Sequence, residues 1–383
     1  MDYRTYIEGY DRIQQEIEIC EKYGRDYRAE QKGRTAAVVA NLHPSQLQLK
    51  LMDVITETPE VKTLRLADAA GGQLPPFQAG QYLSLKLNFG EVHTTRPYSI
   101  SSSPRQRAYY DITVRKIPDG LVSNFLCGLK PGDIITSGSP EGKFVYNPVY
   151  HGKKLCMIAG GSGITPFMSM IREISQAGLE REITLIYGAR SLEEMIFADE
   201  LNELAAKNNN FTFVPLLENA PAAYQGKTGI INAEFLTEAA KINEISMFYL
   251  CGPQGMYEAL NKILNGLGVP HRKIRQEISG LADDPSKNPG WPAGISPDHE
   301  FLVKAAGKTI KAKAGESLLK ALEDAGLKVP SSCRCGECSY CRVKILSGTV
   351  FEPETALVRM SDHKYGYVHA CQAFPTSDLE ILL

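Results

Sequence analysis

Several features that mark other protein classes are missing from this chain of 383 residues. It has no excess of basic residues, since its net charge is −2, whereas nucleic-acid binding needs a basic excess or stripe. No apolar run approaches the roughly 18 residues that span a bilayer. Residues 1–20 are polar, unlike a secretory signal. We therefore expect a cytoplasmic protein that binds no nucleic acid and does not span a membrane.

A disulfide framework is also not expected, because a reducing compartment does not maintain one. The sequence nevertheless holds nine cysteines, and five of them fall between Cys333 and Cys371. Clustering of this kind indicates metal chemistry. Cys20, Cys127 and Cys156 lie in apolar surroundings and are interpreted as small core residues.

The first part of the chain, residues 1–44, is predicted to be a helical extension. One apolar stripe at alternating steps of four and three is formed by Tyr6, Tyr10, Ile13, Ile17 and Cys20. Gly24 is a plausible end for this helix. We expect the helix to pack on the body of the protein, and docking to a partner is the alternative.

The rest of the chain divides by its hydrophobic pattern. Residues 45–150 contain short β-rich segments separated by turns such as LPPF, NFGE and KPGD, which predicts an antiparallel barrel. Residues 151–277 alternate buried strands with helices, which predicts a Rossmann-like parallel sheet covered on both faces. Residues 278–298 are rich in Pro, Gly and Asp and are interpreted as a linker. Residues 299–383 hold two strands, a helix that ends at Gly326, and a cysteine loop.

The cysteine loop has the sequence SSCRCGECSYC, with a C-x4-C-x2-C spacing and a further cysteine downstream. This is the plant-type spacing for a [2Fe–2S] cluster held by four thiolates. The predicted ligands are Cys333, Cys338, Cys341 and Cys371. Gly336 and Ser339 are small enough to let the loop wrap closely around an inorganic core.

A fifth cysteine, Cys335, leaves an alternative. Counted through it, the same loop has a C-x2-C-x2-C spacing that could bind zinc. Zinc motifs usually pair two such knuckles, and the sequence has no second one. We therefore interpret Cys335 as a filler beside the cluster, which could replace Cys333 or Cys338 as a ligand if either were mutated.

A tetrapeptide in the barrel region, Arg96-Pro97-Tyr98-Ser99, lies at the start of a predicted strand. It offers a cation for a diphosphate, an aromatic face on which a ring can stack, and a hydroxyl for a ring nitrogen. By itself the tetrapeptide is a weak signal.

Downstream, Gly120, Val122 and Ser123 begin a short helix. The N-terminus of a helix has free backbone N–H groups, which together with a serine form a phosphate site. A simple helix N-cap is an equally good interpretation of this segment alone.

A glycine-rich turn opens the α/β region. In LCMIAGGSGITPF, three glycines follow a buried strand and lead into a helix: Gly160, Gly161 and Gly163. Their backbone can approach a pyrophosphate closely. The turn departs from the dinucleotide fingerprint G-x-G-x-x-G, because Pro166 stands where the third glycine would be.

Seven motifs occur together and in order: RPYS, GLVS, GSPEGKF, AGGSGITP, YGAR, CGPQGMY and the cysteine loop. On these motifs, residues 45–383 resemble the plant ferredoxin-NADP reductase superfamily with a ferredoxin domain fused at the C-terminus. The domain order is similar to that of the reductases serving hybrid-cluster protein, phenylacetyl-CoA epoxidase and ketosteroid hydroxylase. The resemblance implies an FAD-binding β-barrel (45–150), an NAD(P)-binding α/β domain (151–277) and a β-grasp [2Fe–2S] ferredoxin domain (299–383).

The resemblance also implies roles for single residues. Arg96 would neutralise the flavin diphosphate, Tyr98 would stack on the isoalloxazine, and Ser99 would lie near its N5 atom. The full set of implied cofactor-binding residues is, for FAD, Arg96, Pro97, Tyr98, Ser99, Gly120, Val122 and Ser123, and, for the nicotinamide nucleotide, Gly160, Gly161, Gly163, Thr165, Arg190, Ser191, Cys251, Gly252 and Pro253. Arg190 and Ser191 could receive a 2′-phosphate, but the motif is compatible with NADH or NADPH.

The catalytic residues implied by the resemblance are Ser99, Cys251 and Glu277. Glu277 matches an acidic residue that the family places near the flavin edge. Relatives usually have an aromatic residue two positions later, whereas this chain has Ser279. An ordinary exposed glutamate is therefore the alternative interpretation of Glu277.

A flavin would connect two chemistries that do not match. NAD(P)H gives up two electrons as a hydride, a [2Fe–2S] cluster accepts one at a time, and a flavin can do both. We therefore predict an NAD(P)H-dependent reductase that passes electrons through FAD and the cluster to a separate redox partner protein. One alternative is an electron-transfer subunit of a larger dehydrogenase complex, such as the one accompanying dihydroorotate dehydrogenase. Another is a non-catalytic redox-sensing module. The linker composition further predicts that the cluster domain swings between flavin and partner.

Overall fold

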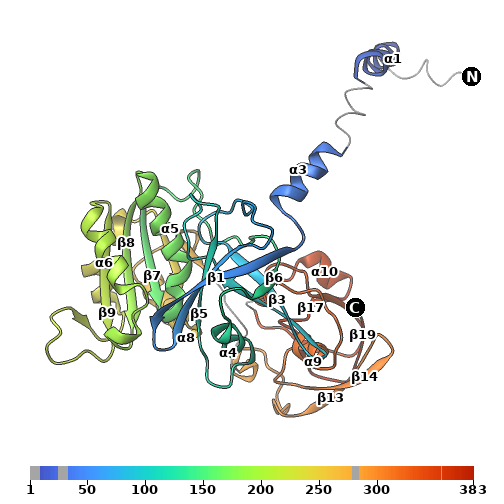
Figure 1. The fold of residues 1–383 in the computed structure, drawn as a ribbon. Helices are drawn as coiled ribbons and strands as arrows, with labels where there is room; N and C mark the ends of the chain where they lie inside the picture. Colours follow the sequence, from blue (N-terminus) through green and yellow to red (C-terminus); the bar gives the residue numbers. More distant parts are fainter. Residues whose placement is uncertain (1–8, 25–32, 278–283, 355) are drawn as a thin grey trace, which may run out of the picture. The chain divides into compact units, whose positions relative to one another are not determined.

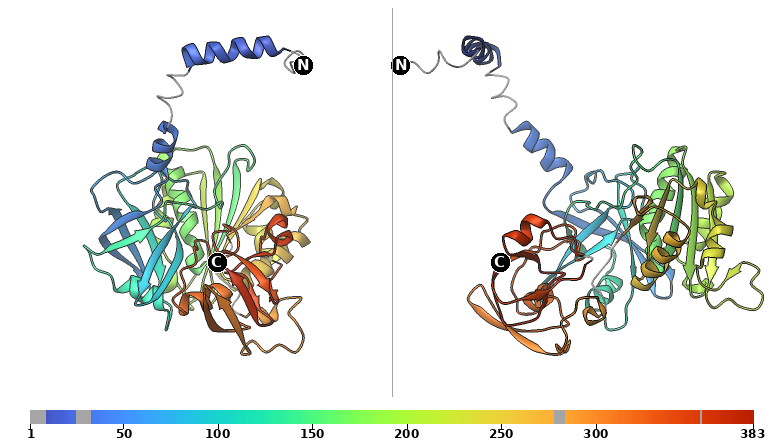
Figure 2. Two further views of the ribbon diagram at one scale, coloured as in Figure 1. Left: turned by 90° about the vertical axis from the view of Figure 1, so that its right-hand side faces the viewer. Right: turned by 180° about the vertical axis from the view of Figure 1, so that it is seen from behind.

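The computed structural model describes four stretches of the chain, residues 9–24, 33–277, 284–354 and 356–383. The chain forms two compact units, residues 1–45 and 46–383. Figures 1 and 2 follow the chain from the N-terminus in blue to the C-terminus in red. Within the described stretches, no helix is long and apolar enough to cross a membrane.

The N-terminal unit contains two helices, α1 (Tyr10–Ile19) and α3 (Arg34–Leu42). A π-helical turn, Cys20–Gly24, extends α1, so this helical segment ends at the predicted glycine. Most of the predicted apolar stripe lies on this segment, whereas Tyr6 lies outside the described residues. The sequence analysis did not predict α3.

The following domain is an antiparallel sheet of six strands in the order β4-β3-β6-β1-β2-β5. The strands are β1 (Leu47–Thr58), β2 (Val61–Asp68), β3 (Tyr82–Phe89), β4 (Val92–Ser99), β5 (Tyr110–Arg115) and β6 (Ile134–Ser137). An antiparallel bridge between Ile100, next to β4, and Ile112 of β5 joins the two edge strands. The predicted antiparallel barrel is confirmed.

The interior of the barrel is filled by alternate residues of its strands. Leu49 and Leu51 of β1 point inward and are fully buried, as a two-residue period requires. The helix α4 (Leu121–Gly128) adds Val122 and Leu126 to the same core. The strand that carries the predicted flavin motif, β4, is therefore held by a packed barrel.

The α/β domain contains a parallel sheet in the order β10-β9-β8-β7-β11-β12. Its strands are β7 (Lys154–Gly160), β8 (Glu182–Ala189), β9 (Phe211–Leu217), β10 (Lys227–Thr228), β11 (Met247–Cys251) and β12 (Ile274–Gln276). Its helices are α5 (Ile164–Ala177), α6 (Ala198–Lys207), α7 (Ala233–Ala239) and α8 (Gln254–Gly266).

Helices cover both faces of this sheet, as predicted. Met157 of β7 packs in one core with α5 and α6, whereas Ile158 packs in another with α7 and α8. The strand order changes direction at β7, which pairs with β8 on one side and β11 on the other. Ligands of open α/β sheets bind at such a switch point, beyond the carboxyl ends of the strands.

The C-terminal domain is a mixed sheet in the order β14-β13-β19-β15-β17, with a separate β16-β18 pair. Its strands are β13 (Glu300–Ala305), β14 (Lys308–Lys313), β15 (Arg342–Ser347), β16 (Val350–Phe351), β17 (Tyr367–His369), β18 (Phe374–Pro375) and β19 (Leu379–Leu382). The helices are α9 (Leu318–Asp324) and α10 (Met360–Lys364). α9 buries Leu318, Leu319 and Leu322 against the sheet.

The described part of the predicted linker is folded. Trp291 packs edge-on against Phe351 of β16, with ring centroids 5.2 Å apart, and its Nε1 donates to the carbonyl of Ile295 at 3.0 Å. The N–H of Gly315 donates to the carbonyl of Pro297 at 2.7 Å. Residues 284–298 are thus attached to the C-terminal domain.

Candidate functional site

The cysteine loop lies between α9 and β15. Its backbone passes three times through the left-handed region, at Arg334 (φ 57°), Gly336 (φ 86°) and Ser339 (φ 61°). Such turns fold a loop back on itself and are costly for residues with a Cβ, so the surrounding structure must hold them. As a result, the backbone N–H of Cys338 points at Sγ of Cys333, 3.4 Å away.

The four predicted ligands form two contacting pairs, Cys333 with Cys338 and Cys341 with Cys371. In a [2Fe–2S] cluster held by four thiolates each iron takes two, so two pairs are what the cluster needs. Cys335 also contacts Cys333, and its exclusion from the ligand set remains a prediction.

On β4, Arg96 fits an anionic group. Its Nη1 donates to Oγ1 of Thr94 and, at 3.0 Å, to the carbonyl of Thr95. No carboxylate in the described part of the chain forms an ion pair with it, and burial together with the nearby Arg334 lowers its pKa to about 10. A phosphate would supply the missing negative charge, which is consistent with the predicted flavin diphosphate. Tyr98 packs on the barrel core, and burial raises its pKa to about 12.

At the start of α4, the polar groups form hydrogen bonds with residues of the same segment. Oγ of the buried Ser123 accepts from the N–H of Ile117 at 3.1 Å and donates weakly to the carbonyl of Gly120 at 3.5 Å. A Cβ on Gly120 would lie 2.6 Å from that hydroxyl, so a side chain there would displace the hydroxyl of Ser123. These bonds shape the loop before the helix. Whether Gly120, Val122 and Ser123 hold phosphate remains a prediction.

The glycine turn follows β7 at the switch point of the sheet. Gly161 has a φ of 53°, and its carbonyl accepts from Oη of Tyr187 at 2.9 Å. A Cβ on Gly163 would lie 2.1 Å from the carbonyl oxygen of Cys251, so only glycine lets the turn approach the end of β11. Oγ1 of Thr165 donates to the carbonyl of Ser162 at 2.8 Å, which fixes the start of α5.

A cavity of about 390 Å³ opens beside this turn. The predicted residues that line it are Gly160, Gly161, Arg190 and Pro253. Three charged residues of the same lining were not predicted from the sequence as site residues: Arg115, Glu194 and Glu218. Nη2 of Arg115, from the barrel strand β5, lies 2.6 Å from Oε2 of Glu194, so an ion pair crosses from one domain to the other. Ser191 lines a neighbouring hollow together with Glu218.

The three predicted catalytic residues meet, although they come from different domains. Oε2 of Glu277 accepts from Oγ of Ser99 at 3.5 Å and from Sγ of Cys251 at 3.7 Å. Glu277 is partly buried, not exposed as the alternative interpretation had it. Burial, together with the nearby Glu337, raises its pKa to about 8. The protonated carboxyl is therefore the main form at neutral pH.

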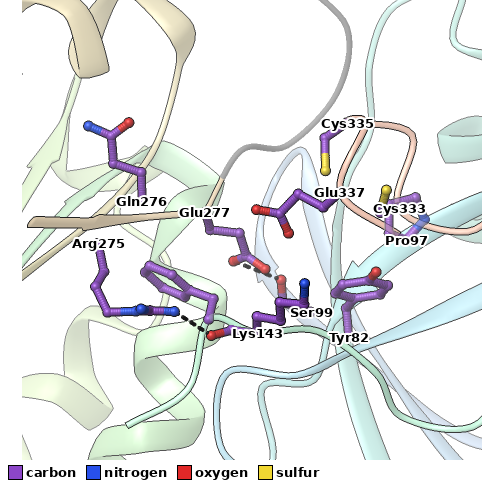
Figure 3. Close-up of a pocket in the computed structure, with 11 residues that line it drawn as sticks. Tyr82, Pro97, Ser99, Lys143, Arg275, Gln276, Glu277, Cys333, Cys335 and Glu337 are labelled. Atoms are coloured by element: carbon purple, nitrogen blue, oxygen red, sulfur yellow. Dashed lines mark hydrogen bonds between the residues drawn. The ribbon is translucent and has the colours of Figure 1, made fainter. Parts of the chain in front are cut away.

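A smaller cavity of about 70 Å³ brings the barrel, the α/β domain and the cysteine loop together (Figure 3). Its lining includes Pro97 and Ser99 from β4, Glu277 after β12, and Cys333 with Glu337 from the loop. Glu337 had no signal in the sequence beyond its place between two cysteines. The predicted flavin motif and the predicted cluster ligands are thus neighbours.

Comparisons with known proteins agree with this division into domains. Residues 48–146 match the oxidoreductase FAD-binding domain, residues 157–262 the oxidoreductase NAD-binding domain, and residues 302–376 the 2Fe-2S iron-sulfur cluster binding domain. The ferredoxin reductase component of 3-ketosteroid-9-alpha-monooxygenase from Mycolicibacterium smegmatis is 31% identical over 345 residues, which cover 87% of this chain and 95% of that protein.

The chain belongs to the ferredoxin-NADP reductase superfamily. Further members that it resembles are the glycine betaine monooxygenase reductase subunit of Pseudomonas aeruginosa (29% identical, covering 87% of this chain and 94% of that protein) and NADH oxidoreductase HCR of Escherichia coli (28%, covering 87% and 96%). Among solved structures, phthalate dioxygenase reductase superposes with a TM-score of 0.64 over 88% of this chain and 97% of that one, at 24% identity.

As a ferredoxin-type reductase, the protein is an oxidoreductase that takes electrons from a nicotinamide nucleotide and passes them through FAD and a [2Fe–2S] cluster to a separate redox partner protein. The prediction of function and cofactors is confirmed. The domain boundaries and the roles of single residues remain predictions.

Proposed function

We propose that this chain is the reductase component of an oxygenase system, that NADH is its electron donor, and that it works in the cytoplasm. The relatives named above include reductase components of two monooxygenases, and the chain aligns with nearly their full length. The observation that carries the proposal is the small cavity where β4, Glu277 and the cysteine loop meet. An electron that enters at the nucleotide side has a short path through this cavity to the cluster loop.

The proposed residue roles are those that the family resemblance implies. Arg96 binds the flavin diphosphate, Tyr98 stacks on the ring, and Ser99 holds its N5 edge, with Pro97, Gly120, Val122 and Ser123 completing the FAD site. Gly160, Gly161, Gly163 and Thr165 shape the nucleotide turn, and Cys251, Gly252 and Pro253 border the nicotinamide. The cluster ligands are Cys333, Cys338, Cys341 and Cys371. The proposed domains are 45–150, 151–277 and 299–383; a helical extension over 1–44 precedes the first, and residues 278–298 link the second to the third.

The bound flavin supplies the change from hydride transfer to single-electron transfer. The chain's own residues place the reactants and control protons. The carboxyl of Glu277 is mainly protonated at neutral pH, and its Oε2 accepts from the hydroxyl of Ser99 and the thiol of Cys251. A neutral carboxyl at this position adds no negative charge where a hydride must arrive.

The preference for NADH follows from the charges around Arg190. Glu194 and Glu218 line the same cavity, and Glu218 also borders the hollow that contains Ser191. A 2′-phosphate brings about two negative charges, which these carboxylates would repel. Arg115 lines the same cavity but is already paired with Glu194 and Glu60. We expect Arg190 to bind the uncharged ribose edge or the diphosphate.

The donor is tested by mixing the oxidised holoprotein anaerobically with NADH or NADPH and following flavin and cluster absorbance. Bleaching with NADH at a kcat/KM at least about tenfold above that with NADPH is expected, because repulsion of this kind amounts to about 1.4 kcal/mol or more. Equal rates would contradict the proposed donor. Cluster absorbance that does not respond to either nucleotide would instead indicate a redox-sensing module.

The acceptor is tested by adding oxygenase components of the related monooxygenases to the reduced chain. Reoxidation that becomes faster with the component and depends on its substrate supports the proposal. A chain that purifies in a fixed complex with a dehydrogenase, and transfers electrons only within that complex, would support the alternative of a dehydrogenase subunit.

A further inference from the structure

Two arginines directly follow predicted cluster ligands, Arg334 and Arg342. Each is paired with a carboxylate of the ferredoxin domain, Arg334 with Glu323 of α9 and Arg342 with Asp362 of α10. Their surroundings differ strongly. The side chains of Arg334 and Glu323 are 7% and 4% exposed, whereas those of Arg342 and Asp362 are 45% and 7% exposed, so only the first pair is buried on both sides. The two arginines therefore have different tasks.

Arg334 reaches out of its own domain to the flavin strand. Its Nη2 donates to Oγ1 of Thr94 at 2.7 Å, and its Nε donates to the carbonyl of Thr95. Glu323 joins the same network, because its Oε2 accepts from Oγ1 of Thr94 at 3.0 Å. A buried network thus links the cysteine loop, α9 and β4, two residues before Arg96.

The residue on the other side of Cys333 is also bonded to the barrel. Oγ of Ser332 lies 2.6 Å from Oγ of Ser84 in β3, which in turn donates to Oε1 of Glu141 at 2.7 Å. Both neighbours of this cysteine are therefore tied to the barrel, one to β3 and one to β4.

A buried ion pair adds little net stability compared with apolar packing, because both charges lose their hydration. Breaking it from one side is expensive, since the remaining charge stays buried without a partner. Such a pair therefore acts mainly by favouring the one arrangement of the domains in which both charges are paired, because any other arrangement leaves a buried charge without a partner. Here the arrangement that it allows is the one with the cysteine loop seated on the flavin strand.

We propose that Arg334 is a positioning residue, which seats Cys333 and the cluster against β4 so that electrons leave the flavin while the ferredoxin domain stays docked. This rests on the proposed roles of β4 and Cys333. A bound flavin would release its two electrons singly and a bound cluster would accept them one at a time, each passing to the acceptor before the next arrives. Arg334 would hold the cysteine loop in place for both transfers. The predicted swing of the cluster domain is not needed for this step.

The test compares four variants of the holoprotein: Arg334→Met, Arg334→Lys, Glu323→Gln and, as a matched control, Arg342→Met. Iron and FAD contents are measured first, and rapid mixing with NADH then separates flavin reduction from cluster reduction. Flavin reduction should stay within about twofold in all four variants, whereas cluster reduction slows at least about tenfold in Arg334→Met, as expected when reacting groups are displaced. Glu323→Gln should show the same selective slowing, Arg334→Lys a smaller one, and Arg342→Met none.

A second readout does not depend on electron transfer. Amide hydrogen exchange in β4 and α9 reports whether the two elements stay packed together. Exchange in both should rise in Arg334→Met and stay unchanged in Arg342→Met.

Cluster reduction in Arg334→Met as fast as in the parent chain would overturn the proposal, as would equal slowing in Arg342→Met. So would unchanged exchange in both elements. If the proposed function itself were wrong, the parent chain would lack iron or would not be reduced by NADH. The difference in amide hydrogen exchange between Arg334→Met and Arg342→Met could still be measured in that case.

Discussion

The flavin barrel has two junctions, and they are built differently. Toward the ferredoxin domain, the contact is made by the buried pair of Arg334 and Glu323, and the cavity there is only about 70 Å³. Toward the nucleotide domain, the pair of Arg115 and Glu194 is 28% and 33% exposed and borders a cavity of about 390 Å³.

The difference matches what each junction must do. A nucleotide has to enter and leave in every turnover, so its side needs space and ion pairs that water and a ligand can replace. The cluster stays in place, so its side gains from a closed contact that holds one geometry. The barrel therefore has an open junction, which lets the nucleotide bind and leave, and a closed junction, which holds the cysteine loop in a fixed position.

The largest effect is expected from removing a cluster ligand. Cys371→Ser should abolish the cluster, because a hydroxyl is a poor ligand for iron where a thiolate is required. Iron and sulfide analysis and the visible spectrum measure this, while flavin reduction by the nucleotide should persist. Cys335→Ser is the matched control and should keep the cluster. If Cys335→Ser lost it instead, our ligand set would be wrong.

The next prediction concerns Glu277, which lies where the barrel, the nucleotide domain and the cysteine loop meet. Its carboxyl has a pKa of about 8, so it is neutral below this pH and ionised above it. An added negative charge opposes arrival of a hydride, so the rate of flavin reduction should fall as pH rises through about 8. Glu277→Gln places an uncharged amide at this position, so the rate of flavin reduction should stay close to that of the parent chain below this pH. It should also remove this pH dependence. If the rate of flavin reduction fell with the same midpoint pH in the parent chain and in Glu277→Gln, the titrating group would be a residue other than Glu277.

On the nucleotide side, Glu194→Gln should make binding easier. The substitution removes one of the two carboxylates paired with Arg115, since Glu60 remains, and it removes a negative charge from the cavity. We expect KM for NADH to fall by about two- to fivefold, the change that a partly exposed ion pair of at most about 1 kcal/mol allows. Steady-state kinetics with an artificial acceptor measure it, and cluster reduction should not change. An increase in KM would show that the carboxylate itself binds the nucleotide.

The smallest effect concerns a single hydroxyl at the closed junction. Ser332→Ala removes the bonds to Ser84 and Glu141, while Ser84 keeps its own bond to Glu141. Because the hydroxyl of Ser332 has a single proton to donate, the free energy of unfolding should fall by about 1 kcal/mol, the usual value for one hydrogen bond. Urea unfolding followed by flavin fluorescence measures it. A decrease in the free energy of unfolding several times larger would mean that the hydrogen bonds of this junction stabilise one another.

Much of this architecture could be predicted, because the signals were local. The spacing of Cys333, Cys338 and Cys341 lies within one loop, and the turn at Gly161 follows a strand that a short apolar run already marks. Strand and helix patterns extend over a few residues, and the order of the domains follows from them. Ser99 and Glu277, far apart in sequence, could be joined only through the family resemblance.

The closed junction could not be predicted. Arg334 looks like an exposed loop arginine in the sequence, and Glu323 occupies a helix in which charged residues alternate with leucines. Their burial depends on a barrel strand more than two hundred residues earlier in the chain. The linker is a similar case. Its composition indicates flexibility, yet Trp291 anchors part of it by packing on Phe351.

The position of β19 has a consequence for biosynthesis. This strand comes last in the sequence but lies inside its sheet, paired with β13 in parallel and with β15 in antiparallel fashion. A nascent chain therefore has all its cysteines outside the ribosome before the sheet beneath them can close. The barrel and the nucleotide domain lie wholly upstream and are free to fold first. We therefore expect stable cluster binding to require that β19 has paired with β13 and β15.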